Sequence, residues 1–157
     1  MSKTTKILWG PTTWTFFHVL AEKINEDFFI KNRNQVINMI INIASNLPCP
    51  LCSEHAKKVL GHNNTRLIKT KVDLINFLHF FHNTVNTRAK KELFKSEDLV
   101  RYKTINLSIA FHNFKIFYTK SYNKSSFQLS LDAMQTTRKR IAYLTTKWIQ
   151  KNWKHFN

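Results

Sequence analysis

Glycine and proline are scarce in this sequence: only two Gly and three Pro occur among 157 residues. Chains built from β-hairpins need many turn residues, and phosphate-binding loops need glycine. The scarcity therefore disfavours a β-sandwich, a β-barrel and a Gly-rich phosphate loop. Thirteen Phe and 43% apolar residues are nevertheless enough to form one packed core. The composition predicts a single, mostly helical domain.

Long apolar runs are also missing. No segment approaches the ~20 apolar residues that a membrane-spanning helix requires. The first residues lack the continuous apolar stretch followed by small residues that marks a secretory signal peptide. We therefore expect no membrane span, no signal peptide and a cytoplasmic protein.

Acidic residues are few. Nine Asp and Glu stand against 25 Lys and Arg, which gives a formal net charge of +16. The excess is greatest in residues 101–157, where 11 basic residues accompany a single acidic one, Asp132. An anionic partner such as nucleic acid is one interpretation of this charge, and a solvated basic surface is the more common one.

Only two cysteines occur, Cys49 and Cys52, in one Cys-Pro-Leu-Cys motif. A bridge across a two-residue loop removes little chain entropy, so the pair is not the disulfide framework of a small secreted protein. At a helix start the pair would suit thiol–disulfide exchange, because the helix N-terminus stabilises a thiolate. With His55 and His62 the same cysteines could instead bind zinc. The spacing leaves redox and zinc chemistry about level, with two inert thiols as a third interpretation.

Apolar periodicity and the positions of Pro and Gly divide the chain into helices. The expected elements, in chain order, are a turn at residues 9–13 that leads into a helix, a helix over 34–47, a short helix from Pro50 to Gly61, a polar loop over 61–70, a long helix over 72–91, a fifth helix capped by Ser96 that continues through Ile109, a polar link over 119–126 and a basic amphipathic helix over 129–153. The pattern predicts an all-α fold.

Three separated segments of the sequence form one pattern. They are W-G-P-x-x-W-x-x-F-H from Trp9, L-P-C-P-L-C-x-x-H from Leu47, and F-H-N-T-V-N from Phe81, followed by Lys91. In order and spacing this pattern resembles the Erv/ALR family of FAD-linked sulfhydryl oxidases, especially the minimal form encoded by large cytoplasmic DNA viruses such as African swine fever virus. The resemblance covers roughly residues 8–103.

The resemblance implies a four-helix bundle with a short fifth helix that holds FAD, usually as a homodimer. Residues 1–103 would form the oxidase domain, and residues 104–157 would be a basic helical extension that packs on it. Cys49 would exchange with substrate thiols, and Cys52 would lie against the flavin. The residues implied to bind the cofactor are Gly10, Trp14, His18, His82, Asn83, Val85, Asn86, Lys91, Arg101 and Tyr102. The last two match a basic–aromatic pair of the family only if one residue upstream of them is deleted. No metal is implied.

The implied activity is disulfide formation in protein dithiols, or in a viral thiol relay protein, with electrons passing through FAD to O2 to give H2O2. The sequence also departs from the family. His79 stands where many members have a structural cysteine, and the additional cysteine pair that larger members use as a shuttle is missing. The competing hypothesis is a small basic zinc-binding protein that recognises nucleic acid through residues 101–157.

Overall fold

The computed structural model describes residues 3–122 and 128–157 and is built from helices. The elements are α1 (Lys3–Lys23), α2 (Glu26–Ala44), α3 (Pro50–Val59), α4 (His62–Thr65), α5 (Lys71–Arg88), the 3-10 helix η1 (Ser96–Lys103), α6 (Leu107–Tyr118), α7 (Gln128–Lys151) and the 3-10 helix η3 (Trp153–His155). The described residues contain no β-strand, only an isolated bridge between Ile24 and Phe156. The all-α prediction is confirmed.

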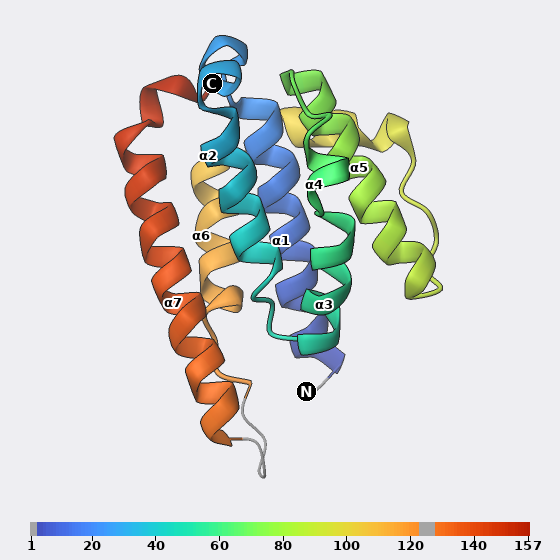
Figure 1. Cartoon of the computed structure of the whole chain (residues 1–157), viewed down its shortest axis with the longest axis vertical. Helices are drawn as coiled ribbons and strands as arrows, with labels where there is room; N and C mark the ends of the chain where they lie inside the picture. The colour runs from blue at the N-terminus through green and yellow to red at the C-terminus, as the bar shows by residue number, and fades with distance from the viewer. Residues whose placement is uncertain (1–2, 123–127) are drawn as a thin grey trace.

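Helix α1 runs through the middle of the molecule, with α5 on one flank and α7 on the other (Figure 1). Its fully buried residues include Phe16, Phe17 and Leu20. Phe16 stacks on Phe114 of α6, with ring centroids 4.8 Å apart. Helix α6 therefore shares one hydrophobic core with α1.

The C-terminal helices are attached to the rest of the chain by polar contacts as well as by packing. Tyr118 at the end of α6 is buried, and its hydroxyl donates to the Ile43 carbonyl of α2 at 3.1 Å. Arg138 of α7 is also buried and donates to the carbonyls of Tyr118 and Lys120. Helices α6 and α7 therefore pack closely on the preceding helices. The domain boundary at residue 103 stays a prediction.

The predicted turn at residues 9–13 is wrong, because these residues lie inside α1. Pro11 is tolerated within the helix. The hydroxyls of Thr12 and Thr13 donate to the carbonyls of Leu8 and Trp9 at 2.6 and 2.7 Å, and so bind the backbone of the turn that the proline disturbs. The helix consequently starts before the proline rather than at it.

The predicted fifth helix is also wrong in its extent. The chain forms η1 and then, after a break, α6, because Asn106 begins a new helix by accepting a hydrogen bond from the Ile109 amide at 3.1 Å. Ser96 does not cap a helix, since Lys95 holds that position.

The remaining predicted segments differ from the structure mainly in their bounds. Helix α2 begins at Glu26 rather than residue 34, because Asn25 caps it, and a kink at Asn32 separates its first turns from the rest. The expected loop over 61–70 contains the one-turn helix α4. The expected helices from Pro50 to Gly61, over 72–91 and over 129–153 are confirmed to within a few residues as α3, α5 and α7. The predicted link at 119–126 lies partly outside the described residues.

Candidate active site

Four of the residues expected at the cofactor site lie together in a cluster of rings formed by α1, α5 and η1. The Trp14 ring is parallel to the His82 ring, with centroids 4.2 Å apart and planes inclined by 8°. His18 lies one helical turn after Trp14, and its ring stacks on Tyr102 at 4.6 Å. A hydrogen bond of 3.1 Å joins His18 Nε2 to His82 Nδ1. The cluster thus contains flat rings, of which Trp14 and His82 are half-buried and His18 and Tyr102 are buried.

Phe94 completes this cluster, and the sequence analysis did not identify it. Its ring lies 5.2 Å from that of His82 and 5.9 Å from those of His18 and Tyr102. The guanidinium of Arg101 lies 4.8 Å above the Phe94 ring and donates to the Tyr102 hydroxyl at 3.0 Å. The only sequence signal is an aromatic residue within the charged stretch 90–98.

Both histidines of the cluster are neutral at pH 7. Burial, followed by the nearby charges of His82, His79 and Arg101, lowers the pKa of His18 to about 3. Burial, followed by His79, Arg101 and Lys91, lowers the pKa of His82 to about 4. Each neutral imidazole has one donor and one acceptor nitrogen, so the His18–His82 bond needs no charge. The cluster therefore presents neutral rings.

The other residues expected to bind the cofactor take varied positions. Gly10 lies two turns before His18 on α1, and a side chain there would meet nothing within 4 Å. Val85 packs at the edge of the core, and Asn86 is half-buried. Lys91 is exposed, and its backbone amide donates to the Asn86 carbonyl, which closes α5. Asn83 directs its side-chain amide to the backbone of Phe94.

The two cysteines form a disulfide at the start of α3, with their Cα atoms 5.2 Å apart. Cys49 is the N-cap residue of the helix, and its Sγ accepts the Cys52 amide at 3.3 Å. The buried hydroxyl of Ser53 accepts the Leu47 amide and donates to the Cys49 carbonyl, which fixes the approach to the helix. Between the cysteines, Leu51 is 71% exposed. Both cysteines are half-buried beside the exposed first turn of α3.

Cationic groups lie near the helix that carries the disulfide. The pKa of His55 on α3 is lowered by burial and by the charges of Arg88 and Lys58. Arg88 is the last residue of α5. The end of α5 therefore adds positive charge close to α3, which no motif in the sequence indicated.

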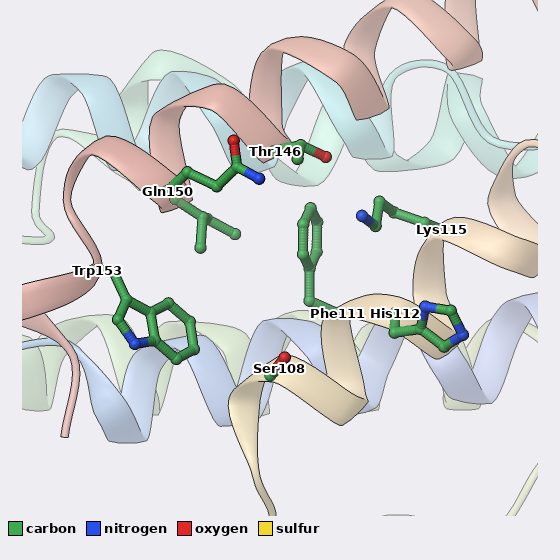
Figure 2. A pocket seen from close by; sticks show the side chains of 8 residues that line it. Ser108, Phe111, His112, Lys115, Thr146, Gln150 and Trp153 are labelled. Carbon is green, nitrogen blue, oxygen red and sulfur yellow. The ribbon is translucent and has the colours of Figure 1, made fainter.

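Two cavities lie outside the ring cluster. A cavity of about 260 Å³ borders the start of α3 and is lined by Ser45, Asn46, Pro50, Leu51, Ser53, Glu54, Lys57 and Met134. A larger one, of about 480 Å³, lies between α6 and α7, with Phe111, Lys115 and Trp153 among its lining residues (Figure 2). Only the first borders the redox motif, and α7 contributes Met134 to it.

The zinc interpretation has no geometric support. No group of three or more His, Cys, Asp or Glu side chains that could hold a metal ion occurs among the described residues.

Across residues 3–122 and 128–157, no helix is both long and apolar enough to cross a membrane.

Comparison with known proteins identifies the family. The family model described as "Erv1 / Alr family" matches residues 11–106, which is more than half of the chain and contains the ring cluster and the disulfide. The chain belongs to the Erv1/Alr family. Two of its relatives are named FAD-linked sulfhydryl oxidases. The one from African swine fever virus (isolate Tick/Malawi/Lil 20-1/1983) is 29% identical over 119 residues, which cover 76% of this chain and 92% of the relative. The one from Arabidopsis thaliana is 30% identical over 88 residues, which cover 56% of this chain and 46% of the relative. No solved structure matches the chain.

The residues of this Erv1/Alr member fit the cofactor named in those relatives. FAD needs flat walls for its rings and polar groups for its edges. The cluster supplies neutral aromatic faces, and the surface beside Gly10 is open. The buried Nε1 of Trp9, next to Gly10, has no hydrogen-bond partner within the described part of the chain. A buried donor without a partner is costly, and a bound ligand would relieve that cost.

Proposed function

We propose that this protein is an FAD-dependent thiol oxidase that forms disulfide bonds in protein substrates. The observation that carries the proposal is the Cys49–Cys52 disulfide at a helix N-terminus, in a chain whose α1, α5 and η1 gather a cluster of neutral rings. The relatives named FAD-linked sulfhydryl oxidase support the same chemistry. The physiological electron acceptor is O2, and the product is H2O2.

The reaction begins at the disulfide. A substrate thiolate attacks Cys49 Sγ, the Cys49–Cys52 bond breaks, and Cys52 leaves as a thiolate. A second substrate thiolate attacks the mixed disulfide, which releases the oxidised substrate and leaves Cys49 reduced. The two electrons now reside on the Cys49 and Cys52 sulfurs. The chemistry that bound FAD supplies is acceptance of this electron pair and its delivery to O2.

The local structure of the chain stabilises the Cys49 thiolate, which is the leaving group when the second substrate thiolate attacks the mixed disulfide. The start of α3 carries the partial positive charge of the helix N-terminus, and the Cys52 amide points at Cys49 Sγ. Lys58 and Arg88 add positive charge near α3. The exposed Leu51 and the cavity beside it give a protein substrate room to approach.

The ring cluster would hold the cofactor. Trp14 and His82 supply flat faces, while the buried rings of His18 and Tyr102 form a second stacked pair. Because burial keeps both histidines neutral, their rings can lie against an uncharged aromatic ligand without placing a buried cation there.

The remaining features of the proposal concern organisation and context. Residues 1–103 form the oxidase unit, and 104–157 form an accessory helical segment that affects dimerisation or the choice of protein substrate. The packing of α7 against α2 and the end of α6 supports an accessory segment that docks on the oxidase unit.

The protein acts as a homodimer in the host cytoplasm or in the virion, on cellular dithiols or on a viral relay protein. The African swine fever virus relative supports the viral setting.

An absorbance spectrum of the purified protein, combined with oxygen uptake, tests the proposal. The wild-type protein should be yellow, absorb near ~450 nm, and consume O2 with a small dithiol. Cys49→Ser and Cys52→Ser should each abolish uptake while they leave the flavin absorbance unchanged, because the sulfurs carry electrons and do not hold the cofactor. Leu51→Ser is the matched control, since it places serine in the first turn of α3, between the cysteines, and keeps both sulfurs. A colourless wild-type protein, or turnover in either cysteine variant, contradicts the proposal.

Deletion of residues 121–157 tests the organisation of the chain. The shortened protein should keep its flavin absorbance and oxidise small dithiols, while its oligomeric state or its activity on protein substrates changes. Loss of all flavin would show that the accessory segment belongs to the oxidase unit.

A further inference from the structure

Three hydrogen bonds hold the backbone of Phe94 against α5. His79 Nε2 lies 2.7 Å from the Phe94 carbonyl oxygen. The side-chain amide of Asn83 donates to that same oxygen at 2.9 Å and accepts the Phe94 amide at 2.8 Å. His79 and Asn83 are one helical turn apart, so both side chains leave the same face of α5. We call these three bonds the Phe94 clamp.

The clamp determines which tautomer His79 adopts. A carbonyl oxygen can only accept, so His79 Nε2 has to carry a hydrogen to bond with it. The 3.2 Å approach between Asn83 Nδ2 and His79 Nε2 is then the contact of two donors that share one acceptor. Asn83 satisfies both backbone groups of Phe94, as a neighbouring β-strand would.

Little else fixes this part of the chain. The residues from Lys90 to Leu93, and those from Lys95 to Asp98, are exposed, whereas Phe94 is half-buried. Hydrophobic burial therefore fixes only the Phe94 ring, and the clamp fixes its backbone. The ring then meets His82, His18 and Tyr102, with the Arg101 guanidinium above it.

We propose that Phe94 is a wall of the FAD site and that His79 and Asn83 are positioning residues that hold it there. The inference rests on the proposed function, since it assigns residues to the cofactor of that reaction. It gives Asn83 an indirect role, through the backbone of Phe94, in place of direct contact with FAD. It also assigns His79, which no motif of the sequence assigned to a function.

The experiment measures how fast FAD leaves the full-length, FAD-loaded protein after dilution, for wild type and for His79→Ala, Asn83→Ala and Phe94→Leu. Asn76→Ala is the matched control, because Asn76 is an exposed asparagine on the same helix. We expect release about tenfold faster in the three variants and unchanged in the control. His79→Gln should restore slow release, because the glutamine amide can still donate to the Phe94 carbonyl.

Limited trypsin digestion gives a second reading that does not depend on FAD chemistry. Lys90, Lys91 and Lys95 are exposed on both sides of the clamp. Loss of the clamp should make cleavage at these lysines several-fold faster in His79→Ala and Asn83→Ala, but not in Phe94→Leu, which keeps the backbone bonds. Mass spectrometry of the fragments identifies the cleaved bonds.

The outcomes separate this inference from the proposed function. If the wild-type protein binds no FAD, the proposed function fails and this inference fails with it. If wild type binds FAD, and the clamp variants release it at the wild-type rate, the positioning role is wrong while the proposed function stands. Should Asn83→Ala not fold, Phe94→Leu and the pair His79→Ala and His79→Gln still decide the question.

Discussion

The Trp14 indole lies parallel to the His82 imidazole, with centroids 4.2 Å apart, so that α1 and α5 meet through two flat faces. Contacts between parallel rings at this distance stabilise the pairing of the two helices. The same two rings are among the residues that the proposed cofactor would contact. Stability and cofactor binding should therefore respond together when either ring is removed.

Replacement of Trp14 by Ala should lower the free energy of unfolding by about 2 kcal/mol, because a half-buried ring and its stacking partner are lost. The protein should also retain much less flavin on purification. Urea denaturation and the absorbance ratio of flavin to protein measure the two effects. Trp153→Ala is the control, since Trp153 is 48% exposed and lies far along the chain on η3. Equal effects in both variants would contradict a special role for the ring cluster.

The two neutral histidines should make the protein less stable in acid. The folded-state pKa values of His18 and His82, about 3 and about 4, lie below the ordinary value of 6.5. Between pH 6.5 and pH 4 the unfolded chain therefore binds more protons than the folded chain. The free energy of unfolding is highest above pH 6.5 and falls as the pH is lowered towards 4. We expect a loss of about 2–4 kcal/mol between pH 7 and pH 5.

Urea denaturation at both pH values measures this loss. His82→Gln should reduce the difference between pH 7 and pH 5, because one of the two titrating groups is gone. The control is His112→Gln, an exposed histidine on α6. A pH dependence that is the same in all three proteins would contradict the assignment.

The turn after α5 depends on one strained residue. Lys90 has a φ of 55°, and the amides of Lys90 and Lys91 bond to the carbonyls of Thr87 and Asn86, which is the arrangement of a Schellman motif. Glycine takes this conformation without strain, whereas a β-branched residue does not. Lys90→Gly should leave stability unchanged or raise it by up to about 1 kcal/mol, and Lys90→Val should lower it by about 1–2 kcal/mol. Thermal denaturation of the two variants, with Lys95→Val as the control, distinguishes strain from side-chain effects.

Arg138 holds α7 to the end of α6. Its buried guanidinium donates to the carbonyls of Tyr118 and Lys120, and burial lowers its pKa from the ordinary arginine value. Arg138→Met should cost about 2–3 kcal/mol, because two charge-assisted hydrogen bonds are lost and the buried Tyr118 carbonyl loses its arginine partner. Arg140→Met, an exposed position on the same helix, should change stability by less than about 0.5 kcal/mol. Similar losses in the two variants would show that the charge, and not the buried bonds, matters.

The sequence predicted those parts of the molecule that follow from spacing. Trp14 and His18 are four residues apart, so one helical face carries both, and the resemblance of residues 8–103 to a known family added His82 and Tyr102. The all-α class followed from the shortage of turn residues. The all-α class is confirmed and these four rings lie together, because local periodicity and motif order are written directly in the sequence. Their role in cofactor binding stays a prediction.

The sequence did not reveal features that depend on contacts between distant residues. Phe94 lies in a charged, exposed stretch, and its position follows from side-chain bonds to residues 11 and 15 positions earlier. Pro11 lies inside a helix because α1 already begins at Lys3, and the apolar periodicity of the sequence did not indicate helix before the proline. The break before α6 depends on the side chain of Asn106, whose capping role becomes evident only when the following amide is seen to meet it.

Helix α1 carries the proposed cofactor walls Trp14 and His18 on one side and the core residue Phe16, packed against Phe114 of α6, on the other. A change of volume in the α6 layer would shift α1 and therefore the spacing of the rings that face α5. Natural variants of this protein should for that reason show paired changes between α6 and the ring cluster. Comparison of many viral relatives at these positions would show whether the inner face of α6 and the cofactor walls evolve together.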